Sequence, residues 1–186
     1  MQLSNARRAL ALAMLGAALV VLAGSALAAS SKGNGSGKAK IVIKGGASFK
    51  RNAYIKDSVH FVAGTVTVRS GGTVTLTNAS KDPHTLSIVK QSQLPRTTSQ
   101  IENCGVCGDL AKAHGVNPEG PPSSGPPPIP LVNVGPVGFD QSGDSVFIGP
   151  KGPGGQVIFK VTAPSGTVLN FMCIIHPWMQ GRILVK

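Results

Sequence analysis

The sequence predicts an all-β protein in which short strands pack as a sandwich. Residues 40–44 form an apolar, β-branched run that is closed by Gly45 and Gly46. Residues 73–77 alternate threonine with apolar residues, which is typical of a strand with one solvent-exposed and one buried face. No comparable stretch in this half of the chain has helical periodicity. Short strands separated by glycine and asparagine turns indicate a β-sandwich.

Further strands are predicted on both sides of a long middle segment. The strand at 167–173 is the most informative of them. Its alternation places Leu169, Phe171 and Cys173 on one face, toward the interior, so Met172 points to the other side. The remaining strands are expected at 59–62, 65–69, 156–162 and 182–186, with glycine turns at 70–72 and 164–166.

Residues 1–28 are predicted to be a signal peptide. Two arginines precede the apolar run at 9–23, and residues 26–28 read Ala-Leu-Ala, which is typical of a cleavage site. A run of fifteen residues is short for a membrane-spanning helix, so an uncleaved N-terminal anchor is the less favoured alternative. We therefore expect an extracytoplasmic protein (periplasmic, cell-envelope or secreted) after cleavage near Ala28.

The rest of the chain is long enough for one domain with a sizeable core. Residues 29–40 are rich in serine, glycine and lysine and are predicted to be a flexible basic linker, so the domain spans 41–186. Contact of the linker with an anionic membrane or cell-envelope surface is an alternative to a role in solubility alone. The eight aromatic residues are not interleaved with basic ones, so no nucleic-acid partner is expected. We predict a monomer.

Residues 91–154 interrupt the strand pattern and are predicted to be a long irregular insertion. The segment contains Cys104 and Cys107, a mildly helical stretch at 109–114 and a proline-rich run at 118–130. Loops of this length are uncommon unless they are functional or cross-linked. The simplest cross-link is a disulfide between the two cysteines, which an oxidising compartment favours.

Two other interpretations of this cysteine pair stay open from the sequence. A thioredoxin-like redox pair needs a preceding βαβ unit, which is absent, so this interpretation is disfavoured. Cys104, Cys107 and His114 could also form part of a second metal site. Three ligands, however, fall short of the four that a structural zinc site normally has.

The strongest functional signal lies near the C-terminus, where a thiol, an imidazole and a thioether follow one another closely. Cys173, His176 and Met179 come directly after a predicted strand. Sulfur and imidazole ligands suit copper better than the hard cations, which prefer oxygen. A second imidazole is available at His84, which Pro83 holds in a defined place before another apolar run. Each residue alone has an ordinary structural explanation, but the combination predicts a metal site.

Together with His84, the loop Cys173-x-x-His176-Pro-x-Met179 resembles the copper site of the cupredoxins, the small blue copper proteins. It is most similar to the loop of amicyanin and its plastocyanin-like relatives. The resemblance implies a Greek-key β-sandwich that binds one type 1 copper ion. It also implies that His84, Cys173 and His176 are the three strong ligands and that Met179 is the weak axial ligand.

The resemblance covers residues 55–90 and 155–186, and it departs at Thr85, where plastocyanins usually carry asparagine. It implies a carrier of single electrons that cycles between Cu(II) and Cu(I) with redox partners, and not an enzyme. Copper delivery or storage is the alternative function. Copper oxidases and nitrite reductases need additional histidines for further copper centres, and this chain has four histidines in all. The net charge of +11 suggests a redox partner with an acidic docking surface.

Overall fold

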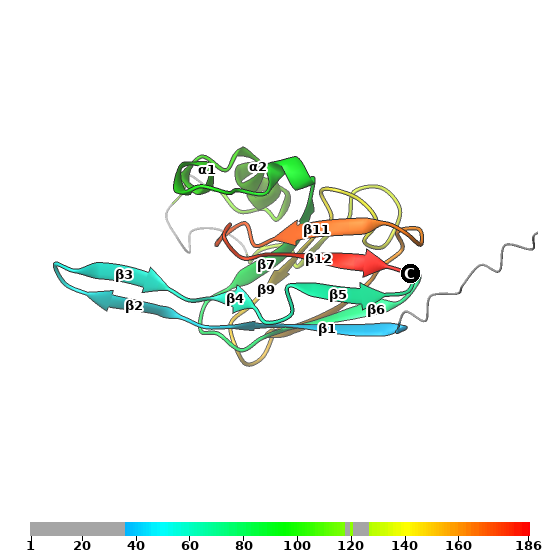
Figure 1. Cartoon of the computed structure of the whole chain (residues 1–186), viewed down its shortest axis with the longest axis horizontal. Coiled ribbons are helices and arrows are strands. Elements are labelled where there is room, and N and C mark those ends of the chain that lie inside the picture. Colours follow the sequence, from blue (N-terminus) through cyan, green and yellow to red (C-terminus); the bar gives the residue numbers. More distant parts are fainter. Residues whose placement is uncertain (1–35, 118–119, 121–126) are drawn as a thin grey trace, which may run out of the picture. The chain divides into compact units, whose positions relative to one another are not determined.

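The computed structural model describes residues 36–117, 120 and 127–186 (Figure 1). All of them belong to one compact unit that spans residues 32–186. The predicted signal peptide and residues 29–35 of the predicted linker lie outside the described residues. None of the described helices combines the length and the apolar character that crossing a membrane requires.

The described residues form two main sheets, a small hairpin and a helical segment (Figure 1). The strands are β1 (Lys38–Lys44), β2 (Ala47–Lys50), β3 (Tyr54–Asp57), β4 (His60–Phe61), β5 (Thr65–Val68), β6 (Thr73–Asn78), β7 (His84–Val89), β8 (Leu131–Val132), β9 (Ser145–Ile148), β10 (Gln156–Lys160), β11 (Val168–Met172) and β12 (Gln180–Val185). The helices are the 3₁₀ helix η1 (Gln91–Gln93), α1 (Thr98–Glu102) and α2 (Gly105–Ala113).

The two main sheets confirm the predicted all-β class. One sheet has the order β10-β6-β1-β4, and the other has the order β5-β12-β11-β7-β9-β8. Strands that are distant in sequence are neighbours in both sheets, as a Greek-key arrangement requires. The pairs β1–β6 and β5–β12 are parallel and the other pairs are antiparallel.

The core forms where the inward faces of the strands meet. On β6, Val74 and Leu76 are buried while the threonines between them are partly exposed, which confirms the predicted alternation. The ring of Phe171 on β11 meets the edge of Phe61 with centroids 5.0 Å apart. Leu169, Phe171 and Cys173 all belong to this core, as predicted. Burying such side chains supplies most of the driving force for the fold.

β7 is unusual because all six of its residues are buried. Leu86 and Ile88 face the sandwich core. Val89 packs on the opposite side in a second cluster with Met172 and with Leu110 of α2. The helical segment therefore covers the outer face of β7 and β11 (Figure 1).

The predicted insertion at 91–154 is wrong in its C-terminal part. β8 and β9 lie within that range, yet they extend the six-stranded sheet, and β9 pairs with β7 in antiparallel register. Phe139, Val146 and Ile148 are core residues. The four-residue strand β9 is flanked by glycines and is too short to reveal its periodicity in the sequence.

Two further boundaries differ from the prediction. The predicted linker at 29–40 is too long, because β1 begins at Lys38 and pairs there with Thr73 of β6. Residues 47–57 were not predicted to be regular, but they form the exposed β2–β3 hairpin, in which Phe49 pairs with Ile55. Their side chains are 72% and 78% exposed, so no buried face marked these strands in the sequence.

Cys104 and Cys107 are joined by a disulfide at the start of α2. The bond closes a ring of only four residues, for which the entropy of loop closure stabilises the fold by about 2 kcal/mol. Because both cysteines lie in one helical turn, the bond does not tie the helical segment to the sandwich. Leu110 of α2 attaches the helical segment to the sandwich by packing against β7 and β11.

Candidate metal centre

The candidate metal centre forms where the start of β7 meets the end of β11. His84 is the first residue of β7, and Cys173 directly follows β11. The two strands are antiparallel neighbours with Met172 opposite Ser87, so this register brings the two ligands together. His176 lies in the loop that connects β11 to β12.

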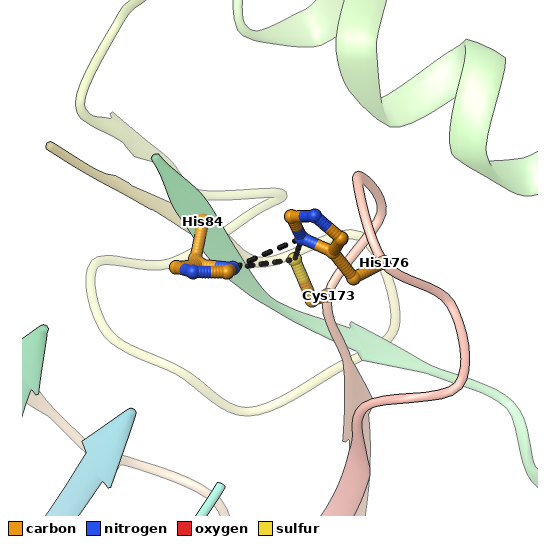
Figure 2. Close-up of side chains that lie close together, drawn as sticks. All are labelled: His84, Cys173 and His176. Atoms are coloured by element: carbon orange, nitrogen blue, oxygen red, sulfur yellow. Dashed lines mark hydrogen bonds between the residues drawn. The ribbon is translucent and has the colours of Figure 1, made fainter. Parts of the chain in front are cut away.

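Three ligand atoms converge on one point (Figure 2). The Nδ1 atoms of His84 and His176 lie 3.7 Å and 3.8 Å from Sγ of Cys173 and 3.1 Å from each other. His84 and Cys173 are fully buried, whereas His176 is partly exposed. The structure therefore brings together three of the four residues that the sequence singled out, with no carboxylate among the converging atoms.

A buried hydrogen-bond network orients His84. The side-chain hydroxyl of Ser80 donates to Oδ1 of Asn78 at 2.8 Å, and its oxygen accepts from Nε2 of His84 at 2.8 Å. Asn78 in turn donates to the carbonyl oxygens of Asp82 and Gly149. With the proton held on Nε2, the lone pair of Nδ1 faces Cys173, which is the tautomer that a metal ligand needs.

Cys173 has a hydrogen-bond donor aimed at its sulfur. The backbone N–H of Thr85 donates to Sγ at 3.3 Å. The hydroxyl oxygen of Thr85 accepts from the N–H of Ile174 at 2.9 Å, which fixes the chain immediately after the thiol. Burial raises the pKa of the Cys173 thiol, and the hydrogen bonds to the sulfur oppose this shift. A metal bound at this site would favour the thiolate form of Cys173, because a cation beside the sulfur stabilises its negative charge.

The ligand loop is closed by its own backbone. Cys173 N–H donates to the Met179 carbonyl at 3.0 Å, and Met179 N–H donates to the His176 carbonyl at 2.8 Å. Met179 is 2% exposed and packs in the same core cluster as Cys173. Met172 belongs to the cluster on the other side of β11, as the alternation predicted. Met179 is thus the methionine on the same side as the three converging atoms, and its role as the axial ligand stays a prediction.

His176 is the ligand candidate that reaches the surface. Its Nε2 lies 3.7 Å from Oδ2 of Asp57 at the end of the β2–β3 hairpin. The other oxygen of Asp57 accepts from the N–H of Val59, which holds the carboxylate in place. The ring of Trp178 meets His176 edge-on with centroids 5.2 Å apart, and Trp178 is 43% exposed.

The sequence did not identify Ser80, Asn78 or Asp57 as parts of the site. Two polar residues shortly before a histidine in a turn are a weak signal that could have indicated the Asn78–Ser80 network. No local signal exists for Asp57, because its contact with His176 depends on the hairpin.

His114 has a structural role away from the metal centre. Nδ1–H donates to the carbonyl of Ile129, and Nε2 accepts from the hydroxyl of Ser145 at 2.7 Å. Ser145 also lies 2.6 Å from the hydroxyl of Ser87, so His114 anchors the end of α2 to β9 and β7. Both ring nitrogens are occupied and both neighbouring cysteines are in a disulfide. The structure therefore contradicts the alternative of a second metal site at these three residues.

The metal-free protein is expected to lose stability as the pH falls from about 6.5 to about 4. Burial lowers the pKa of His84 to about 4 and also lowers the pKa values of His114 and His176. Within this pH window the unfolded chain binds more protons than the folded chain. The free energy of unfolding therefore rises with pH through the window, and the contribution of these histidines is fully present above it. For His84 alone the loss is at most about 3 kcal/mol.

Urea unfolding of the metal-free protein at about pH 7 and about pH 4.5 measures this effect. The variant His84→Gln should show a smaller loss between the two pH values. His60, which is exposed on β4, provides the control, and His60→Gln should retain the full loss. A urea midpoint that does not fall at the lower pH would contradict the prediction.

The fold and the site together define a β-sandwich protein with a His-Cys-His group, largely buried, that could hold a metal ion. No protein-family model and no curated protein matches the chain. Among solved structures it is similar to reduced auracyanin from Roseiflexus castenholzii, with 21% identity, coverage of 82% of this chain and 98% of that chain, and a TM-score of 0.41.

It is also similar to a purple cupredoxin from Nitrosopumilus maritimus, with 16% identity and a TM-score of 0.39. The match covers 80% of this chain and 99% of that chain. Amicyanin from Paracoccus versutus has 13% identity with this chain and a TM-score of 0.36. The match covers 85% of this chain and 87% of that chain. At these TM-scores the likeness is loose, and the ligand assignment rests on the geometry of the chain itself.

Proposed function

We propose that this protein is a type 1 copper protein that carries single electrons between redox partners. The convergence of Sγ of Cys173 with the Nδ1 atoms of two buried or partly buried histidines carries this proposal. When bound, copper supplies a one-electron Cu(II)/Cu(I) couple. The proposed ligands are His84, Cys173 and His176, with Met179 as the weak fourth ligand.

The donor set favours copper over other metals. One thiol and two imidazoles converge, a thioether is buried on the same side, and no carboxylate is among the converging atoms. Hard cations such as Ca²⁺ and Mg²⁺ prefer oxygen ligands, and structural zinc sites usually have four strong nitrogen or sulfur ligands. Three strong ligands and one weak thioether are the pattern of an electron-transfer copper site.

The protein holds its ligand atoms in place by hydrogen bonds that do not depend on a metal. Ser80 fixes the ring of His84, Thr85 fixes the sulfur of Cys173, and the backbone of Met179 fixes the loop. Ligands held in this way move little when the charge at the centre changes. A small rearrangement lowers the barrier to electron transfer, so rigidity serves a carrier better than it serves a protein that must release its metal.

We propose that redox partners dock beside His176, the only one of the three converging ligands that is partly exposed. The β2–β3 hairpin borders this side through Asp57 and carries Lys50, Arg51 and Lys56. These charges support the expectation of an acidic partner. The hairpin also presents exposed apolar side chains that can pack against such a partner.

Reduction of the oxidised copper form is expected to depend on ionic strength. The rate with an anionic reductant such as ferrocyanide should fall as salt is added, because salt screens the attraction. The double variant Lys50→Glu/Lys56→Glu should slow the reaction roughly tenfold at low salt. Lys160 pairs opposite Thr73, at the end of β6 remote from Asn78 and the metal centre, so Lys160→Glu is the control for each single charge reversal, Lys50→Glu or Lys56→Glu. Equal rates at low and high salt would argue against a basic docking surface.

The site of action outside the cytoplasm also remains part of the proposal. It rests on the signal-peptide pattern of residues 1–28, and an exported copper protein would meet its partners in the cell envelope or beyond. We also propose that the protein acts as a monomer and that the basic linker contacts an anionic surface.

Copper titration of the mature protein, residues 29–186, tests the proposed function. We expect one copper per chain, an intense thiolate-to-copper absorption band in the visible spectrum and narrow hyperfine splitting in paramagnetic resonance. Weak colour with normal splitting, or copper that exchanges readily with a chelator, would instead favour copper delivery or storage. Absence of copper binding would overturn both functions.

A further inference from the structure

The disulfide between Cys104 and Cys107 lies outside the metal centre, and the proposed function does not use it. Because it closes a single helical turn, it does not cross-link the helical segment to the sandwich, although both cysteines pack at the edge of the cluster of Val89, Leu110 and Met172. Both cysteines are half-buried and not sealed in the core.

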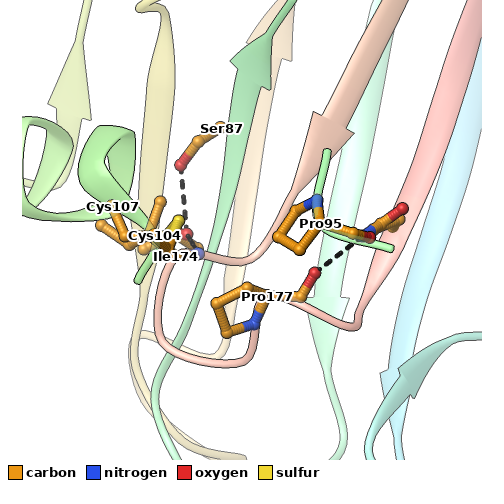
Figure 3. Close-up of a disulfide and its surroundings, with 8 residues drawn as sticks. Ser87, Pro95, Cys104, Cys107, Ile174 and Pro177 are labelled. Carbon is orange, nitrogen blue, oxygen red and sulfur yellow. Dashed lines mark hydrogen bonds between the residues drawn. A yellow bond between two sulfur atoms is a disulfide. The ribbon is translucent and has the colours of Figure 1, made fainter. Parts of the chain in front are cut away.

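Two cavities adjoin this cysteine pair. Cys104 and Cys107 both line a cavity of about 450 Å³ whose other walls include Ile101, Ile174 and Trp178. Cys104 also lines a second cavity of about 470 Å³ on its other side, and Cys107 is not among the residues of that cavity. Figure 3 shows the disulfide next to Ile174 of the ligand loop. Cys104 therefore lines both cavities, whereas Cys107 lines only the first of them.

The helix that follows favours a thiolate at the first cysteine. Cys104 occupies the N-cap of the nine-residue helix α2, and its own side chain accepts no capping hydrogen bond. The N–H of Cys107 donates to the backbone carbonyl of Cys104. The first turn contains no acidic residue. Free N–H groups and the positive end of the helix dipole stabilise a sulfur anion at this position once the disulfide opens.

We propose that Cys104 and Cys107 form a thiol–disulfide exchange site whose substrate is a cysteine thiol on an apolar segment of another protein. The partner thiolate attacks Sγ of Cys104, the bond between the two cysteines breaks, and Cys107 leaves as a thiolate that takes up a proton. A second thiol of the partner then displaces Cys104. The partner gains a disulfide. Cys104 and Cys107 take up two electrons and two protons and are left as two thiols.

The apolar walls of the larger cavity select the kind of substrate. Ile101, Ile174, Pro177 and Trp178 offer surface to aliphatic or aromatic side chains that flank the partner cysteine. Glu102 is the acidic residue that lines this cavity, and it disfavours anionic substrates. We therefore expect a neutral, apolar cysteine segment to react faster than glutathione, which carries negative charge.

Redox equilibration of the folded protein is the first test. Oxidised and pre-reduced samples are placed in glutathione buffers of graded ratio, quenched by alkylation and mapped by peptide mass spectrometry. We expect both samples to reach the same reduced fraction with an unchanged circular dichroism spectrum. A disulfide that resists reduction until denaturant is added, or a fold that is lost upon reduction, would show that the bond is only structural.

A matched pair of variants then identifies the reactive sulfur. The probe is a blocked apolar peptide with one cysteine, supplied as its own disulfide. Cys107→Ser should form a mixed disulfide at Cys104 about tenfold faster than Cys104→Ser forms one at Cys107. Equal rates would overturn the assignment of Cys104.

Peptide mapping separates these adducts from any reaction at Cys173, which is fully buried. Copper content and the visible spectrum are measured on the same samples. Both variants should keep the spectrum of the unmodified protein, so failure of the exchange site is distinguishable from failure of the proposed copper function.

Discussion

Replacing Cys173 by serine is expected to abolish the intense visible absorption of the copper-loaded protein. The band requires charge transfer from a thiolate, and a serine hydroxyl at this position is a poor, hard ligand for copper. The change replaces a sulfur atom by a smaller oxygen atom at a fully buried position. This change in volume is small, so the sandwich should still fold. The visible spectrum after addition of copper is the measurement.

Two methionine variants complete this experiment. Met179→Leu should keep the colour and shift the reduction potential, because it removes only the weak axial ligand that we propose. Met172→Leu is the matched control, since Met172 is equally buried but packs on the opposite side of β11. It should change neither colour nor potential. An unchanged visible band in Cys173→Ser would refute the copper assignment.

Ser80→Ala is expected to weaken copper binding by about ten- to a hundredfold. Ser80 is not a ligand, but its hydroxyl links Nε2 of His84 to Asn78 in a fully buried network. Without this hydroxyl, the proton of Nε2 has no partner and the ring of His84 is free to change tautomer or orientation. Loss of such an orienting partner typically has an effect of this size on metal affinity.

The same substitution should destabilise the metal-free protein by about 1–3 kcal/mol, because it leaves buried polar groups unsatisfied. Competition with a copper chelator and urea unfolding measure the two effects. Ser165 lies exposed in the turn before β11, so Ser165→Ala is the matched control and should change neither quantity. If Ser80→Ala binds copper as tightly as the unmodified protein, the network does not position His84.

The sequence singled out the four residues proposed as ligands because their chemistry is local. Cys173, His176 and Met179 lie within seven positions, and the loop between two strands brings them together wherever those strands pack. His84 was predicted from the proline before it and the apolar run after it. The antiparallel register of β7 and β11 then joins the two segments. This register could not be read from the sequence, because β7 is buried on both faces and shows no alternation.

The middle of the chain was predicted less well because its structure depends on contacts that are distant in sequence. β9 has four residues and becomes a strand only because β7 offers a free edge to pair with. The β2–β3 hairpin has no buried face, so apolar alternation carries no information about it. The cysteine pair predicted a disulfide, but its place at a helix N-terminus beside two cavities could be seen only in the fold.

By itself the sequence determined the all-β class, the core faces of the strands at 73–77 and 167–173, and the four residues proposed as ligands. These features follow from periodicity and side-chain chemistry, which act over a few residues. Only the tertiary structure decided that Ser80 orients His84, that Asp57 faces His176 and that His114 is structural. Each of these roles depends on hydrogen bonds or charges between separate segments, and their geometry exists only once the two sheets and the helical segment have packed together.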